Sequence, residues 1–148
     1  QQKMHKDYDP DAILKWNFPV LDEYISKDCG LAEAGWLERD LMPKIKRCLE
    51  YVARAVQHHL IEGKPKEGIF FGLFGADFIL DKNLTPWLAE IQKGPGLSYS
   101  DPMKKEIIPP MLNEAVDMAF EVQDMVEAGE SLQDLEARKK FEWIINEW

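Results

Sequence analysis

The stretch GLFGADFILDKNLTPWLAEIQKGPG, residues 72–96, contains two apolar runs on either side of a short polar segment. The runs, Ile69 to Leu80 and Pro86 to Gln92, have the composition of β-strands, and DKNLT between them is typical of a turn. The sequence therefore predicts a β-hairpin here.

The register of this hairpin decides which side chains share a face, because side chains alternate along a strand. A turn centred between Asn83 and Leu84 places Asp77 opposite Glu90, with the rest of each strand following in step. The first face is then wholly apolar and collects Phe74, Ala76, Phe78, Leu80, Trp87, Ala89 and Ile91. The second face mixes apolar and oxygen-bearing side chains and collects Gly75, Asp77, Ile79, Leu88, Glu90 and Gln92. We expect the first face to be the core face and the second to be a binding site.

Two carboxylates directly opposed in a sheet repel each other unless a positive charge lies between them. A divalent cation would supply that charge, and Gln92 on the same face adds a neutral carbonyl oxygen. Few protein ligands and open coordination positions suit Mg²⁺ shared with nucleotide phosphates. Ile79 and Leu88 would offer an apolar wall to a base or substrate. The alternative is a solvated face, or one neutralised by a Lys or Arg from elsewhere, and register alone leaves both open.

Two long helices flank the hairpin in the sequence. Apolar residues recur every three or four positions from Asp40 to Leu60 and from Pro110 to Ala128, with Asp40 as a cap and Gly63 and Gly129 as stops. Residues 4–26 predict a loop and a short helix, and a capped helical segment is expected from Ser131 onward. We therefore expect an α+β fold in which a hairpin, part of a larger antiparallel sheet, is packed by two long helices, with residues 1–148 forming a single domain.

Composition limits the partners of the chain. With 148 residues and a net charge of −9, the surface as a whole disfavours nucleic acid and anionic membranes. No apolar run approaches the ~20 residues that a membrane helix needs. Cys29 and Cys48 form no CxxC pair, which favours reduced thiols in a cytosolic protein. His58 and His59 have no second metal ligand at helical spacing, so we expect His59 at the edge of the core.

The run FGADFILDKNLTPWLAEIQKGPGLS, residues 74–98, resembles the C-terminal motif of the tubulin tyrosine ligase-like family, and KMHKDYDP, residues 3–10, is similar to an upstream stretch of that family. The resemblance implies an ATP-grasp fold that ligates an amino acid to a carboxylate of tubulin or another protein, through an acyl phosphate made from ATP. It implies that Asp77, Glu90 and the residue at position 92 hold Mg²⁺ on the ATP phosphates. We expect Asp77, Ile79 and Glu90 to contact ATP, and assign no catalytic residue. It also implies a cytoplasmic, cytoskeleton-associated protein.

Two departures from the family pattern define a second hypothesis. Gln92 stands where the family has Asn, which lengthens one proposed ligand by a methylene. The lysines that grip adenine and the α-phosphate are expected before Gln1, so this chain would supply only the metal and phosphate half of the site. The alternative is a non-catalytic, ATP-grasp-like module that binds or scaffolds a protein partner.

Overall fold

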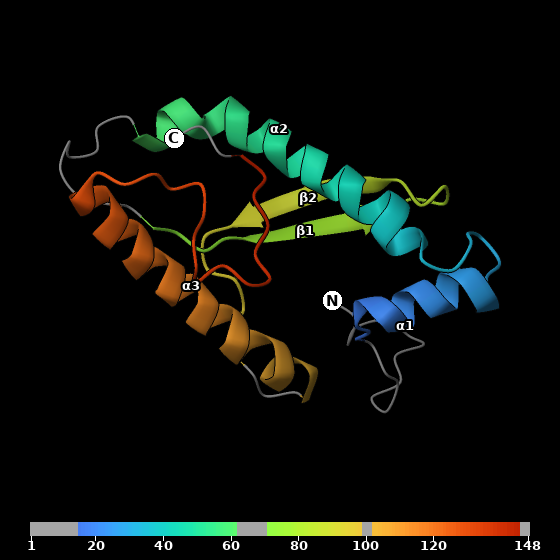
Figure 1. Cartoon of the computed structure of the whole chain (residues 1–148). Helices are drawn as coiled ribbons and strands as arrows, with labels where there is room; N and C mark the ends of the chain where they lie inside the picture. Colours follow the sequence, from blue (N-terminus) through green and yellow to red (C-terminus); the bar gives the residue numbers. More distant parts are fainter. Residues whose placement is uncertain (1–14, 62–70, 99–101, 146–148) are drawn as a thin grey trace. The chain divides into compact units, whose positions relative to one another are not determined.

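The computed structural model describes residues 15–61, 71–98 and 102–145, with the side chains of residues 60 and 61 excepted (Figure 1). The chain divides into two compact units, Gln1–Asp40 and Leu41–Trp148. The described residues form an α+β structure, as the sequence predicts, with three α-helices and one two-stranded antiparallel sheet. The larger antiparallel sheet that was expected is not found among the described residues. The upstream motif at residues 3–10 lies outside them, and the single-domain assignment stays a prediction. None of the described helices is long and apolar enough to cross a membrane.

The first unit is built around a short helix. Helix α1, Phe18–Glu23, begins after Asn17, whose side-chain oxygen accepts a hydrogen bond from the Val20 amide at 3.0 Å. The helix continues as a π-helical turn, η2, Tyr24–Asp28. Asp22 accepts hydrogen bonds from the backbone amides of Gly35 at 2.8 Å and Leu37 at 3.0 Å, and these bonds hold the pKa of its carboxyl below the usual range. The returning chain is thereby fixed against the helix.

Helix α2, Met42–Ile61, confirms the first predicted long helix. The predicted cap at Asp40 is wrong. A π-helical turn, η3, Leu37–Leu41, precedes α2, and Asp40 lies inside this turn and not at the start of a helix. The predicted stop at Gly63 lies outside the described residues. His59 is exposed, so its expected place at the edge of the core is wrong.

Helix α3, Pro102–Ala128, is longer than the sequence predicts, since it runs through Pro109 and Pro110. Prolines inside a helix remove backbone hydrogen bonds, and the burial of Ile108, directly before them, offsets part of this loss. Gly129 ends the helix as predicted, with φ of 70°, and the Glu130 amide donates to the Met125 carbonyl at 2.8 Å.

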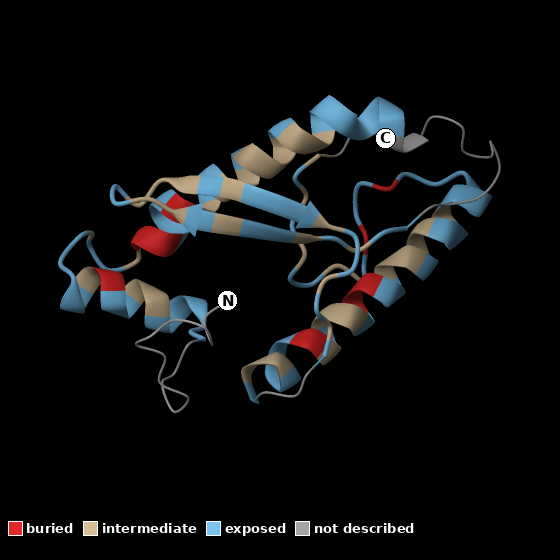
Figure 2. Ribbon diagram, turned by 180° about the vertical axis from the view of Figure 1, so that it is seen from behind, coloured by how far each residue is buried: buried red, intermediate tan, exposed pale blue. Residues whose placement is uncertain are grey.

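The segment after α3 was predicted to be helical, and this is wrong. Residues 131–145 form turns and irregular chain that run back along α3. Their backbone amides donate to carboxylates of α3, as described below, which replaces the hydrogen bonds that a helix would supply. Among the residues that the structure describes, the buried side chains lie in this segment, in α3 and in the N-terminal elements (Figure 2). They are Ile25, Trp36, Leu37, Leu41, Ile108, Glu114, Ala115, Leu132 and Leu135.

The hairpin consists of β1, Gly75–Leu80, and β2, Pro86–Gln92. Asp77 lies opposite Glu90, as predicted, but the register shifts by one residue beyond this pair, and Ala89 has no partner. This β-bulge places Leu88 opposite Phe78 and Trp87 opposite Ile79. The predicted faces are therefore wrong for two residues: Leu88 belongs to the core face, where it is half-buried, and Trp87 belongs to the face of the carboxylates.

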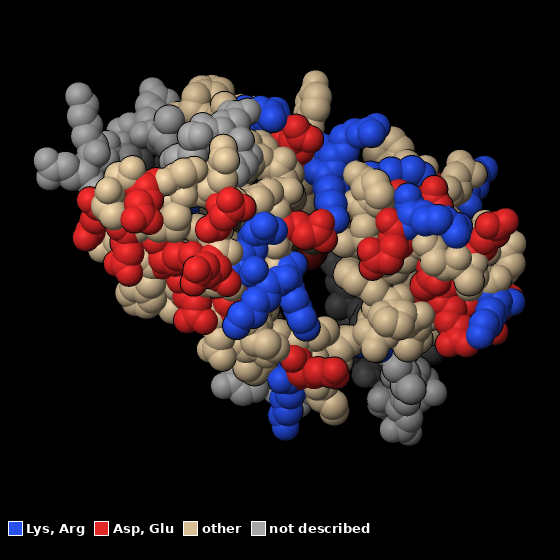
Figure 3. Space-filling model, in the orientation of Figure 1, with Lys and Arg blue, Asp and Glu red and all other residues tan. Residues whose placement is uncertain are grey.

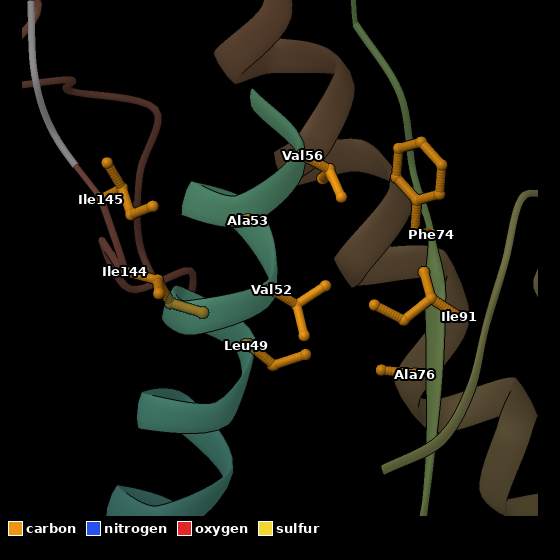
Figure 4. A pocket seen from close by; sticks show the side chains of 9 residues that line it. All are labelled: Leu49, Val52, Ala53, Val56, Phe74, Ala76, Ile91, Ile144 and Ile145. Carbon is orange, nitrogen blue, oxygen red and sulfur yellow. The ribbon is translucent and has the colours of Figure 1, made fainter. Parts of the chain in front are cut away.

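Two apolar cavities lie beside the hairpin and the chain that leads into it. Helix α2 contacts β2, and an apolar cavity of about 580 Å³ is lined by α2, by the core face of the hairpin and by residues 144–145. In Figure 4, Val52 and Val56 of α2 point toward Phe74 and Ile91. Helix α3 instead lines a second cavity, of about 230 Å³, with residues 71–73 and the chain beyond Ser131.

Candidate functional site

The predicted site lies on the exposed face of the hairpin. Asp77 in β1 and Glu90 in β2 are cross-strand partners and both are exposed. Gln92 follows two residues after Glu90, opposite Gly75, and its amide nitrogen donates to Asp77 Oδ2 at 3.3 Å. The structure thus brings together all three residues that the sequence assigns to a metal.

Neither carboxylate is neutralised by a basic side chain of the described residues. The ion pairs found there involve other acids, for example Glu23 with Lys27 and Glu50 with Arg54. The alternative of a salt-bridged face therefore finds no support in the described part of the chain, and two like charges stand opposed on one sheet face. Opposed like charges weaken a sheet, and a cation between them would relieve the repulsion. Because both side chains are exposed, the alternative of a solvated face stays open beside the metal site.

Trp87 is the site residue that sequence reasoning missed. Its side chain is 62% exposed beside Ile79, which is 63% exposed, so these two form the apolar part of the carboxylate face in place of Ile79 and Leu88. The signal lies in the length of the loop: DKNLT has an odd number of residues, its centre is Asn83, and this pairs Leu80 with Pro86.

Asp81 fixes both the turn and the indole of Trp87. Its Oδ1 accepts from the backbone amides of Asn83 at 2.8 Å and Thr85 at 2.9 Å, and its Oδ2 accepts from Trp87 Nε1 at 3.1 Å. The bonds from Thr85 and Trp87 lead in lowering the pKa of the Asp81 carboxyl, since they stabilise the charged form. An ionised aspartate therefore orients an exposed aromatic ring on the face of the carboxylates.

The loop after β2 closes against the same end of the hairpin. A Cβ placed on Gly75 would lie 3.2 Å from Gln92 Cγ and 3.2 Å from Pro95 Cβ, so the loop packs tightly against the strand at this glycine. Lys104 of α3 donates to the Gly96 carbonyl at 3.0 Å. Helix α3 thus fastens the loop that borders Gln92.

The donor set can be tested against a metal. Among the residues that the structure describes, no group of three or more His, Cys, Asp and Glu side chains could hold an ion. An ion at Asp77 and Glu90 would therefore have two carboxylates and, after rotation of its amide, the Gln92 oxygen. Hard oxygen ligands in small number, with positions left open, fit Mg²⁺ bound together with phosphates.

Comparisons with known proteins agree with the motif. The family model described as the Tubulin-tyrosine ligase family matches residues 5–128. The chain is 31% identical to the probable tubulin polyglutamylase ttll-9 of Caenorhabditis elegans over 116 residues, which is 78% of this chain and 26% of that protein. It is 27% identical over 135 residues to the protein polyglycylase TTLL10 of Rattus norvegicus, covering 88% of this chain and 19% of the relative.

A third relative, the inactive polyglycylase TTLL10 of Homo sapiens, is 28% identical over 138 residues, with 88% of this chain and 19% of the relative covered. The chain thus spans about a quarter or less of the length of these relatives. No solved structure matches it. The family match covers most of the chain and includes the whole hairpin, so this chain belongs to the tubulin-tyrosine ligase family.

Proposed function

We propose that this chain supplies the metal and phosphate half of an active site that ligates an amino acid to a protein carboxylate with ATP and Mg²⁺. The observation that carries the proposal is the cross-strand pair Asp77 and Glu90, exposed and without a basic partner in the described residues, in a chain of this family. The names of its relatives, a tubulin polyglutamylase and protein polyglycylases, support tubulin or another protein as the acceptor.

Each residue of the carboxylate face has a role in this proposal. Asp77 and Glu90 bind the ion, and Gln92 turns its amide oxygen from solvent toward it. When bound, Mg²⁺ neutralises charge on the ATP phosphates and so stabilises phosphoryl transfer. Ile79 and the indole of Trp87 contact the nucleotide and exclude water beside the carboxylates. Asp81 acts through Trp87 as a positioning residue, because it holds the indole nitrogen.

The second candidate function is a non-catalytic binding or scaffolding module. Gln92 favours it, since its nitrogen rather than its oxygen faces Asp77 and Mg²⁺ tolerates displaced ligands poorly. A relative named as an inactive polyglycylase supports the same reading.

Paramagnetic Mn²⁺, used in place of Mg²⁺ with and without ATP, distinguishes the two functions. In the 148-residue chain, we expect Mn²⁺ to broaden the amide signals of residues 75–92, and Asp77→Asn with Glu90→Gln to weaken this by roughly 100-fold, because two of three ligands are changed. Asp124→Asn, which removes an exposed acid from α3, is the matched control and leaves the broadening unchanged. Broadening that is absent from the hairpin, or that survives the double substitution, contradicts the metal site and favours the module.

A further inference from the structure

Residues 131–145, which we call the C-terminal strap, are fastened to α3 through their backbone. Glu114 Oε1 accepts hydrogen bonds from the amides of Lys139, Lys140 and Phe141 at 2.6, 2.6 and 2.9 Å. Two turns along α3, Glu121 accepts from the amides of Glu136 at 2.6 Å and Ala137 at 2.8 Å. Two carboxylates therefore satisfy five consecutive or near-consecutive amides of a segment that has no helix or strand of its own.

The strap continues from α3 to α2. Glu142 forms an ion pair with Lys46 of α2, and the next residues, Ile144 and Ile145, line the cavity that α2 shares with Ala76 and Ile91 of the hairpin (Figure 4). Ala76 and Ile91 are cross-strand partners and directly adjoin Asp77 and Glu90 in sequence. The end of the strap thus forms, beside α2, part of the wall of the cavity behind the proposed metal face (Figure 4).

A second cavity repeats this arrangement. Phe141 and Trp143 of the strap line it together with residues 71–73, which lead into β1. Leu132 and Leu135 anchor the start of the strap, with 5% and 6% of their surface exposed. The chain entering β1 and the core face of the hairpin therefore each share a cavity wall with the strap.

We propose that the C-terminal strap is a releasable clasp that closes the apolar back of the hairpin and so regulates the carboxylate face. The inference rests on the proposed function for the role of that face, but the clasp itself does not. The strap lies beyond residue 128, where the match to the family model ends.

The strap can detach from α3 without unfolding of the rest of the molecule, because of the kind of bonds that hold it. Beyond the buried anchors Leu132 and Leu135, residues 136–145 are held by hydrogen bonds to two carboxylates and by one partly exposed ion pair. Both adjoining cavities leave the apolar contacts loose, since space remains between the strap and the chain behind the hairpin. Segments with few buried side chains and no secondary structure open locally at lower free energy than the core.

Hydrogen exchange on the 148-residue chain tests the clasp without any nucleotide. We expect Glu114→Ala to raise amide exchange of residues 136–141 by roughly tenfold or more, because three amides lose a charged acceptor. Exchange of the hairpin, residues 75–92, rises by a smaller factor, and that of residues 17–37 in the first unit does not change. Glu106→Gln, at an exposed position of the same helix, is the control and changes none of the three.

A second variant tests the apolar end of the strap separately from its hydrogen bonds to α3. Ile144→Ser with Ile145→Ser keeps Glu114 and its three amides, so we expect faster exchange in the hairpin with residues 136–141 still protected. The proposal is overturned if Glu114→Ala leaves residues 136–141 protected, or if it raises exchange equally in residues 17–37. It is also overturned if hairpin exchange stays unchanged in both variants. A failure of Mn²⁺ to bind the hairpin would refute the proposed function and leave these exchange results standing.

Discussion

Two pairs of carboxylates in this molecule have the same chemistry and opposite surroundings. Glu114 and Glu121 on α3 together accept five backbone amides, and Glu114 is buried. Asp77 and Glu90 on the hairpin are exposed and face each other across the strands, and within the described residues they receive one side-chain hydrogen bond, from the Gln92 amide. The first pair has its oxygens satisfied by the fold, and the second leaves them available to a ligand.

This difference separates carboxylates that hold the fold together from carboxylates that are available to bind a ligand. Acidic side chains crowd the face of α3 seen in Figure 3, yet the two that are bonded to the strap serve the fold. A structural carboxylate costs stability when it is removed, because its donors lose their acceptor. A carboxylate held opposite a like charge costs little when removed, and its loss relieves repulsion.

The largest expected effect follows from this contrast. Glu114→Ala should lower Tm by about 5 °C or more, because three backbone amides are left without an acceptor. Glu90→Ala should change Tm by about 1 °C or raise it, since no donor in the described part of the chain depends on its oxygens and an opposed charge is removed. Thermal unfolding followed by circular dichroism measures both. Equal losses in the two variants would break the distinction between the pairs.

Acid should erase the contribution of Glu114. Hydrogen bonds from Phe141, Lys139 and Lys140, with the nearby charge of Lys139, hold the pKa of Glu114 below its ordinary value of 4.5. A lowered folded-state pKa gives stability that is fully present above the ordinary value and is lost as the pH falls through the lower, folded value. The Tm difference between the wild type and Glu114→Gln should therefore be constant from pH 7 to about 5 and shrink below the ordinary glutamate range. A difference that grows on acidification would contradict this assignment.

Sequence periodicity was sufficient for the elements that carry their own pattern. The apolar spacing of α2 and the run Pro86 to Gln92 predict elements close to those observed. The strap was not predictable in this way, because its conformation depends on acceptors at Glu114 and Glu121, which lie more than ten residues away in the chain. A local pattern does not report such a partner, and the sequence there suggested a helix.

The candidate site shows the same limit at a finer scale. The pairing of Asp77 with Glu90 was predictable, since it follows from alternation and an approximate turn centre. The side of the sheet taken by Trp87 was missed, because the loop length and the pairing of Asp77 with Glu90 imply different turn centres, and the bulge at Ala89 satisfies both. Leu88 is placed on the core face while Glu90 stays opposite Asp77, and only an unpaired residue between them allows both.

The smallest expected change in Tm concerns Asp81. Its carboxylate accepts hydrogen bonds from the fold and lies on the same hairpin as Asp77 and Glu90, so it allows the most direct comparison with that pair. Asp81→Asn keeps Oδ1 for the amides of Asn83 and Thr85 but replaces the oxygen that accepts from Trp87 Nε1. We expect it to lower Tm by about 1–2 °C, and Trp87→Phe, which lacks the donor, to do the same. Because both substitutions remove one hydrogen bond, the double variant should be no less stable than either single variant. Additive losses would show that the indole and the carboxylate act separately, and an Asp81→Asn variant as stable as Glu90→Ala would place Asp81 with the available acids.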